Sequence, residues 1–354
     1  MSTARSVPLA ALKVLPEPEL EFRYEQRMHD PHAGLALFGP YSADKTSHPK
    51  SLVYGVLGSP QGTEAFHAWS RLMRQAIVEP LEPKWKMGRL IPPDDRKQYL
   101  LWPPFPGFQA AFAAEWPERH AWKSELDRDH LVKLATQTNA HVRAHDVVST
   151  YCDALSRAKS RDENFHAMIC VIPDEVYDNC RPLSKVKAAG KARVQSLPTP
   201  DQLSFSVDFR RQLKGRAMEF GIPIQIVRES TLRMGPPIKG NMRGLTPMSD
   251  RGWNLGSVLY YKAGGKPWRL ATARKGVCYI GLAFRRTGGE EDRTACCAAQ
   301  MFLDSGDGIV FKGEFGPWYS PNQKECHLDK ANAKQLLAGA LKTYYEQGGE
   351  ELTE

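Results

Sequence analysis

The side chains of Arg210 and Lys214 are spaced in a way that could bind an anion. They lie four residues apart in a segment, Val207–Phe220, whose apolar side chains recur at helical spacing. Cations one helical turn apart repel each other unless an anion lies between them. Gln225 follows eleven residues after Lys214, in the next predicted strand, and adds an amide donor. A guanidinium, an ammonium and an amide directed at one point suit a terminal phosphate, although this spacing also fits a solvated basic helix face.

A further cation, Lys262, opens the segment Lys262-Ala-Gly-Gly-Lys-Pro-Trp268. Its two glycines permit a close approach of the backbone to a ligand. The G-x-x-x-x-G-K-[ST] frame of a nucleoside-triphosphate loop is missing. The segment therefore adds a cation to the candidate site without defining a nucleotide-binding loop.

The charge of the chain favours a partner that is rich in phosphate. The 354 residues carry a formal net charge of +8, and residues 181–216 include nine Lys or Arg against two acids. The seven cysteines form no C-x-x-C pair, and no second pair completes a metal site with His29 and His32 or with Cys326 and His327. We therefore expect reduced thiols and no zinc. Neither a long apolar span nor a signal peptide is present, so the expected location is the cytoplasm, with no membrane partner.

Apolar runs and helical spacings alternate along the first three quarters of the chain. This alternation indicates an α/β fold with a mainly parallel sheet and helices on both faces. The predicted strands are residues 51–57, 165–172 and 222–227, and the predicted helices start at residue 62 and cover residues 131–158 and 207–220, with Gly221 as the stop of the last.

A second unit is predicted to begin near Trp268. Strands are expected at residues 277–284 and 297–303 and from Gly308, followed by a helix over residues 332–345. In that helix we expect Leu336, Leu337 and Leu341 on one side. Three antiparallel strands and a helix form the first half of an RNase H-like fold, and the chain ends one strand short of where such a fold continues.

Several blocks in this order resemble the MID–PIWI module of Argonaute proteins, and specifically its short prokaryotic branch. The blocks are Pro18–Phe22, His29–Pro31, Gly34–Tyr41, Trp102–Phe108, Val171–Tyr177 and Lys262–Trp268. The resemblance implies an N-terminal lead-in over residues 1–37, a doubly wound, Rossmann-like MID domain over residues 38–266, and a C-terminally incomplete, RNase H-like PIWI domain over residues 267–354.

The resemblance also assigns the basic residues a role. In this family, four positions hold the 5′-phosphate of a guide, and they match Arg210, Lys214, Gln225 and Lys262 here. The first position is often Tyr or His in relatives, so the Arg at this position keeps the phosphate role but offers no ring to stack on the first base. A Mg²⁺ ion often bridges guide phosphates in the family, and we note it as a possible cofactor.

The slicing members of the family carry a metal-binding carboxylate at the end of the first PIWI strand. The matching stretch here is Tyr279–Phe284, and the position falls on Ala283. A methyl group cannot bind Mg²⁺. Asp304 and Asp307 are nearby carboxylates, but we expect them in a hairpin turn. The sequence thus predicts an inactive slicer site and no catalytic residue.

The resemblance implies a guide, expected to be RNA, and a single-stranded DNA target from plasmids or phage. It also implies an APAZ-domain partner that carries an effector of the TIR, sirtuin or nuclease type, which target pairing would activate in defence. The alternative is a guide-directed nuclease whose catalytic carboxylates lie outside this chain. A small-molecule phosphate enzyme is a third hypothesis, but no Gly-rich fingerprint follows a strand.

Overall fold

The computed structural model describes residues 15–78, 84–86, 89–91, 103–161, 163–184, 186, 197–234, 245–274, 276–286, 294–303 and 308–346. The predicted turn at residues 288–291 and the carboxylates Asp304 and Asp307 lie outside these ranges. The chain divides into two compact units. The larger unit contains Phe22–Gln26 and Asp30–Pro267, and the smaller contains Met1–Glu21, Arg27–His29 and Trp268–Glu354.

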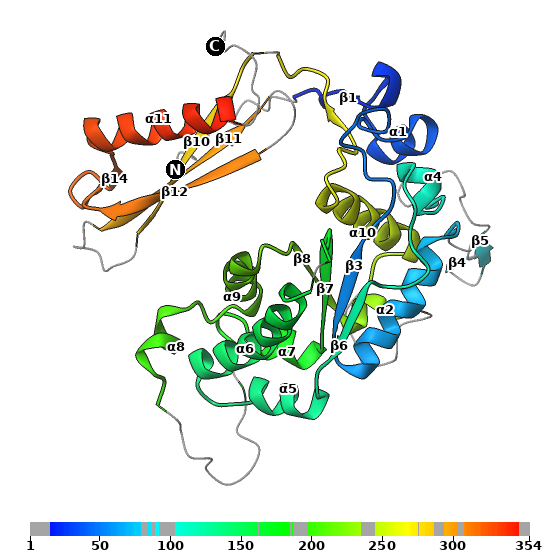
Figure 1. The fold of residues 1–354 in the computed structure, drawn as a ribbon, viewed down its shortest axis with the longest axis horizontal. Coiled ribbons are helices and arrows are strands. Elements are labelled where there is room, and N and C mark those ends of the chain that lie inside the picture. The colour runs from blue at the N-terminus through cyan, green and yellow to red at the C-terminus, as the bar shows by residue number, and fades with distance from the viewer. Residues whose placement is uncertain are drawn as a thin grey trace, which may run out of the picture. The chain divides into compact units, whose positions relative to one another are not determined.

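A four-stranded parallel sheet forms the centre of the larger unit (Figure 1). Its strands, in spatial order, are β6 (Trp122–Glu125), β3 (Tyr54–Gly58), β7 (Ala167–Ile172) and β8 (Ile224–Arg228). All three pairings are parallel. Every side chain of β7 is buried, which fits a central strand of a sheet covered on both faces. The mixed α/β class with a parallel sheet is therefore confirmed.

Helices connect these strands and cover the sheet. The larger ones are α2 (Pro60–Met73), α5 (Arg128–Ala135), α6 (Ala140–Lys159), α9 (Phe209–Arg216) and α10 (Met248–Lys262). Shorter helices are α1 (Pro31–Phe38), α4 (Phe108–Phe112), α7 (Asp174–Asn179) and α8 (Pro200–Ser204), and a small hairpin pairs β4 (Lys84–Lys86) with β5 (Arg89–Ile91).

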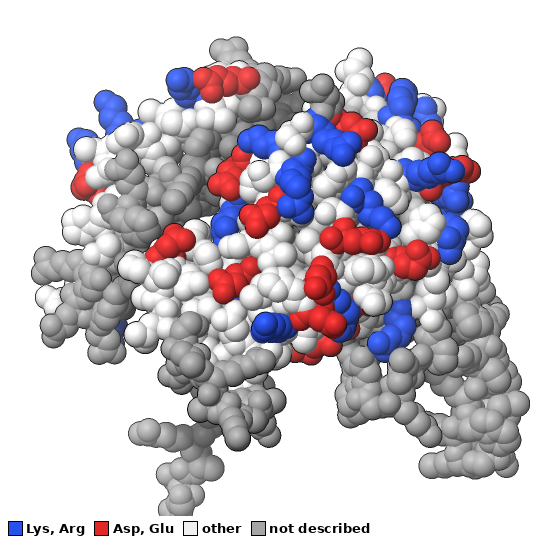
Figure 2. Space-filling model, turned by 60° about the horizontal axis from the view of Figure 1, so that its bottom comes forward, with Lys and Arg blue, Asp and Glu red and all other residues white. Residues whose placement is uncertain are grey.

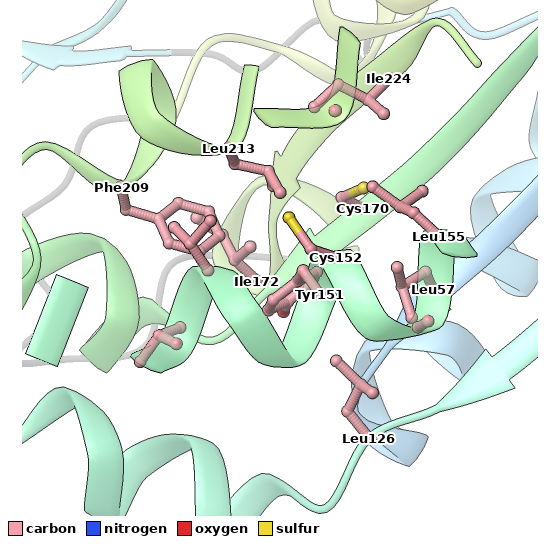
Figure 3. Packing of buried hydrophobic residues seen from close by; sticks show 14 of the residues in the cluster. Leu57, Leu126, Tyr151, Cys152, Leu155, Cys170, Ile172, Phe209, Leu213 and Ile224 are labelled. Carbon is pink, nitrogen blue, oxygen red and sulfur yellow. The ribbon is translucent and has the colours of Figure 1, made fainter. Parts of the chain in front are cut away.

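The hydrophobic core of this unit joins α6 and α9 to the sheet. Figure 3 shows Phe209 and Leu213 of α9 beside Tyr151 and Cys152 of α6, and all four belong to one buried cluster. The Tyr151 hydroxyl donates to the carbonyl of Val171 at 2.8 Å, so even the polar end of this buried ring has a partner. This packing fixes the rotation of α9 and hence the direction of its polar side.

The single helix predicted over residues 131–158 is wrong, because two helices occupy this stretch. Helix α5 ends at Ala135, and α6 begins at Ala140 after the N-cap residue Asn139, whose side chain accepts hydrogen bonds from two backbone amides. An asparagine there satisfies the free amides of a new helix start better than it supports a helix interior. Gly221, with φ of 68°, follows a 3₁₀ turn over Ala217–Phe220, and the predicted stop at this glycine is confirmed.

The smaller unit contains an antiparallel sheet of β10 (Tyr279–Arg286), β11 (Ala295–Phe302) and β12 (Gly308–Gly316), followed by helix α11 (Lys330–Glu346). The unit also contains a small sheet of β2 (Arg27–Met28), β1 (Leu20–Glu21) and β9 (Arg269–Leu270), and a pair of two-residue strands, β13 (Tyr319–Ser320) and β14 (Glu325–Cys326). Buried Glu21 forms an ion pair with Arg269 within the small sheet.

The predicted apolar side of α11 is partly wrong. Leu336 packs against the core, but Leu337 is 48% exposed and Leu341 is 38% exposed. The buried residues of the helix are Ala340 and Tyr344, which together with Leu336 form an i, i+4, i+8 stripe. The large Tyr344 ring decides which side of the helix faces the sheet. No helix in the described ranges combines the length and apolar composition of a bilayer span.

Candidate functional site

A cavity of about 600 Å³ opens at the carboxyl ends of two neighbouring strands of the parallel sheet. Ile172 at the end of β7 and Arg228 at the end of β8 lie on its wall, together with the first residues of α9 and one side of α10. Ligands of open α/β sheets bind at the carboxyl ends of the strands. Arg210 and Gln225, two of the predicted phosphate-binding residues, line this cavity.

Helix α9 carries Arg210 and Lys214 on its exposed side. Asp208 caps the helix by accepting a hydrogen bond from the amide of Arg211 at 3.0 Å, and Phe209 and Leu213 are buried in the core. Arg210 and Lys214 each follow one of these apolar residues, so they lie on a neighbouring, exposed face of the helix, one turn apart. The side chain of Asp208, the one carboxylate on the described cavity wall, is thus engaged by the backbone.

Lys262 is the last residue of α10, and a buried polar network fixes the turn that follows it. The Tyr260 hydroxyl lies 3.0 Å from Ser42 Oγ and 2.9 Å from His48 Nδ1, and the amide of Lys266 donates to Ser42 Oγ at 2.8 Å. Gly265 is required here because a Cβ atom at this position would lie 2.3 Å from the Tyr260 ring. The segment Lys262–Lys266 therefore has one defined conformation.

The three cations are neighbours in the fold. Burial, and then the charge of Arg210, lowers the pKa of Lys214. Burial, and then the charge of Lys214, lowers the pKa of Lys262. Within the described part of the chain, no carboxylate forms an ion pair with any of them. Like charges held together without a counter-charge favour the binding of an anion.

Gln225 is the one predicted residue without a direct link to the lysines. It shares the cavity wall with Arg210, but its Nε2 donates to the carbonyl of Ile226 at 3.2 Å, and no hydrogen bond joins it to the cations. The structure thus places Lys214 near both Arg210 and Lys262. Arg210 and Gln225 line the cavity, whereas Lys214 and Lys262 are not among the residues of its described wall. Their role in holding a phosphate stays a prediction.

The charged residues on one face of the molecule are of mixed sign. On the face that Figure 2 presents, Lys and Arg alternate with Asp and Glu, so that most positive charges there have negative neighbours. Exposed pairs of this kind contribute little. The positive net charge by itself therefore does not define a binding face.

Sequence reasoning missed several residues of the cavity wall. Tyr177, Arg181 and Arg228 line it, with the Arg181 guanidinium 4.6 Å and the Arg228 guanidinium 3.7 Å from the centre of the Tyr177 ring. Arg251 lies on the α10 side of the wall. Tyr177 ends the block Val171–Tyr177, and Arg181 begins the basic segment. Both residues follow closely after the predicted strand over residues 165–172, and this position could have indicated that they line a site at the strand end.

Ala283 lies on an exposed part of the small antiparallel sheet. It is opposite Ala298 on β11, and Ala298 is in turn opposite Lys312 on β12. Strand β10 continues to Arg286, three residues past Ala283, so this position lies inside the strand rather than at its end. The described residues contain no group of three His, Cys, Asp or Glu side chains that could hold a metal ion.

No protein-family model and no curated protein sequence matches this chain. Argonaute proteins are among the solved structures that are similar to it. These include Aa-Ago with externally bound siRNA, at 10% identity over 94% of this chain and 34% of that one, with a TM-score of 0.42.

A second similar structure is Marinitoga piezophila Argonaute in complex with 5′ OH guide RNA, at 9% identity over 94% of this chain and 37% of that one, with a TM-score of 0.40. A third is the same protein in complex with 5′ OH guide RNA and target DNA, at 10% identity over 94% of this chain and 37% of that one, with a TM-score of 0.38. The chain thus spans about a third of the length of the structures it matches. Identities and TM-scores this low do not assign the chain to a family.

The chemistry of the site is that of anion binding. A guanidinium and two ammonium groups offer donors and charge to a phosphate. The described wall provides no set of free carboxylates, so its side chains do not form a magnesium site of their own.

Proposed function

We propose that this chain is the guide-binding part of a short prokaryotic Argonaute, which holds the 5′-phosphate of a nucleic-acid guide and does not cut the target itself. The observation that carries the proposal is the chain of neighbouring cations Arg210, Lys214 and Lys262, of which Arg210 lines the cavity, with no carboxylate paired to them in the described ranges. The blocks of sequence resemblance support the same assignment.

Electrostatics explains why a terminal phosphate suits these residues. The lowered pKa values of Lys214 and Lys262 mean that their charged forms are disfavoured in the free protein. A bound phosphate would remove this penalty, since each hydrogen bond between charged partners contributes about 1.5–3 kcal/mol. A 5′-phosphate carries more negative charge than an internal phosphodiester, so the site would distinguish a guide end from the rest of a strand.

The proposed domain organisation is a Rossmann-like MID domain over residues 38–266, after a lead-in over residues 1–37, and part of an RNase H-like PIWI domain over residues 267–354. The parallel sheet with a cavity at its strand ends supports the first part. The order of three antiparallel strands and a helix in β10, β11, β12 and α11 supports the second. The sequence resemblance supports both the MID and the PIWI assignment.

Ala283 supports a non-cutting role. Two-metal hydrolysis needs a carboxylate that bridges the ions, and Ala283 offers none at the matching position. The alternative function is a guide-directed nuclease whose catalytic carboxylates lie outside this chain. Any Mg²⁺ at the guide end would depend on phosphate oxygens and water, because the cavity wall lacks a carboxylate set.

The proposed partners follow from the resemblance. They are a guide RNA, a complementary single-stranded DNA and an APAZ-domain effector of the TIR, sirtuin or nuclease type, which target pairing would activate in anti-plasmid or anti-phage defence in the cytoplasm. The guide RNA and target DNA named for the Marinitoga piezophila complex are of the same classes.

The deciding experiment compares two guides that differ only at the 5′ end. Purified protein should bind a 5′-phosphorylated RNA more tightly than the same RNA with a 5′-hydroxyl, in a fluorescence titration at fixed salt. Equal affinities would contradict the proposal. Sequencing the nucleic acid that copurifies with the protein would show whether the natural guide is RNA.

A further inference from the structure

Two guanidinium groups lie over the ring of Tyr177 on the wall of the cavity. Arg228 covers one face at 3.7 Å, and Arg181 lies 4.6 Å from the ring centre. Arg228 is neutralised, because its Nε donates to Asp174 at 2.8 Å and its guanidinium also reaches Asp178 at 3.5 Å. Arg181 forms no ion pair in the described part of the chain. Of the two cations on this ring, Arg181 alone has its charge available to a ligand.

A buried arginine fixes the turn that carries Arg181. Arg143 is 2% exposed, and its guanidinium donates to the carbonyl of Asn179 at 2.7 Å and to that of Ser184 at 2.8 Å. Ser184 in turn donates its amide to the carbonyl of Arg181 at 3.2 Å. The Cys180–Ser184 turn is thus held from both ends, so Arg181 projects from a fixed backbone.

The same turn is joined to the start of α9. The amide of Phe209 donates to the carbonyl of Cys180 at 2.9 Å. Arg181 and Arg210 each directly follow one partner of this bond, and both line the cavity. The nearest carboxylate on that wall, Asp208, is engaged as a helix cap. Two unpaired guanidinium groups therefore lie on neighbouring backbone segments beside one cavity.

We propose that Arg181, held against Tyr177, binds a second anion: the first internucleotide phosphodiester of the strand whose terminal phosphate lies at Lys214 and Lys262. This inference rests on the proposed function. A cavity of about 600 Å³ is larger than one phosphate needs and is typical of ligands with several groups. The planar fork of a guanidinium matches two phosphate oxygens, and stacking on Tyr177 holds that fork in place with little loss of side-chain freedom on binding.

The test removes the cation and the anion separately. Two 5′-phosphorylated RNAs are compared, one with a normal first linkage and one with an uncharged methylphosphonate there, by fluorescence anisotropy at fixed salt. Arg181→Ala should weaken binding of the normal RNA about tenfold, the loss expected for one charged hydrogen-bonded contact. It should leave the affinity for the methylphosphonate RNA nearly unchanged. The matched control is Arg211→Ala, which removes the same charge from an exposed residue that does not line the cavity.

Each outcome decides the question. If Arg181→Ala loses affinity for the normal RNA alone, the second anion subsite is supported. If it loses affinity equally for both RNAs, the subsite is overturned. The same loss from Arg211→Ala would also overturn it, because general attraction would then explain the effect. If the unmodified protein does not distinguish 5′-phosphate from 5′-hydroxyl, the proposed function fails instead. Arg181→Lys, which keeps the charge without the planar fork, should recover only part of the affinity, and full recovery would contradict the role of the fork.

Discussion

Lys262 at the end of α10 is half-buried near Lys214 of α9, and its burial, followed by the charge of Lys214, lowers its pKa. The two residues are 48 positions apart in the sequence and belong to different helices. Arg210 extends the cluster by lowering the pKa of Lys214 in the same way. An arrangement that holds three cations together destabilises the free protein locally, and binding of an anion reverses this effect.

Removing two of these cations tests the site. The double substitution Arg210→Ala and Lys214→Ala should weaken binding of a 5′-phosphorylated guide by about 2–4 kcal/mol, allowing for non-additivity between neighbours. Both side chains are exposed, so the fold should persist. The loss for a 5′-hydroxyl guide should be much smaller, as measured in parallel titrations. Equal losses for both guides would remove the case for a terminal-phosphate site.

The lowered pKa values predict a pH dependence. Anion binding requires charged lysines, and it raises their pKa values, so binding takes up protons wherever the free lysines are partly deprotonated. Affinity should therefore fall as pH rises towards the ordinary lysine pKa of about 10.4, earlier than for a normal lysine. The stability of the unliganded protein should change with pH in the opposite direction. Between the lowered pKa of these lysines in the folded chain and their ordinary pKa, the unfolded chain binds more protons than the folded chain, so the free energy of unfolding rises with pH.

Calorimetry checks the proton uptake. At alkaline pH, the apparent binding enthalpy of a 5′-phosphorylated guide should differ between two buffers with different heats of ionisation. Lys214→Arg is the control: it should reduce the difference between the two buffers, because arginine stays charged throughout this range and takes up no proton on binding. A binding enthalpy that is the same in both buffers would count against the lysines as phosphate ligands.

Salt should weaken guide binding strongly. Lysines and arginines displace counterions from a single strand, with a slope of about −0.7 in log K against log salt for each phosphate neutralised. Substitution of Arg210 and Lys214 should reduce this slope, whereas substitution of the exposed Arg211 should change it little. An affinity that is insensitive to salt would mean that the basic segment is only a solvated face.

The buried network behind Lys262 gives a prediction on stability. Tyr260→Phe removes the hydroxyl that lies between Ser42 and His48 and leaves both without this partner in a buried place. We expect a loss of about 1–3 kcal/mol in the free energy of unfolding. Denaturant unfolding would measure it. Tyr261→Phe is the matched control, because Tyr261 is 53% exposed and should tolerate the change.

Local patterns in the sequence were enough to predict the parallel sheet and the polar side of α9. Apolar runs mark β3, β7 and β8, and the spacing of Phe209 and Leu213 determines which side of α9 faces the core. The break between α5 and α6 was missed because the apolar spacing continues across it, whereas the cap at Asn139 depends on a hydrogen bond that spacing does not reveal. The rotation of α11 was missed because Tyr344, rather than Leu337 and Leu341, fills the space at the sheet.

The candidate site was predictable only in part. The spacing of Arg210 and Lys214 and the segment after Lys262 carried a local signal, and the structure brings these residues together. The cavity wall formed by Tyr177, Arg181 and Arg228 depends on the bond between Phe209 and Cys180 and on the anchoring by Arg143. Such contacts join residues distant in sequence, so no window of the sequence contains them.

The last prediction concerns catalysis: the protein should bind a guide–target duplex without cutting it in Mg²⁺ or Mn²⁺. Under the proposed resemblance, Ala283 matches the position of the metal-bridging carboxylate, and the residue paired with it across the sheet is Ala298. Arg285, two residues along the same face of β10, would repel a metal ion and attract a phosphate backbone. Ala283→Asp should not restore cleavage, because a bridging carboxylate holds two metal ions only together with further ligands, and the described ranges contain no group of three His, Cys, Asp or Glu side chains that could supply them. The measurement is gel analysis of a labelled target incubated with guide-loaded protein, with a mismatched guide as the control. Guide-directed cleavage by the unmodified protein, free of any partner, would overturn the non-cutting role and favour the nuclease alternative.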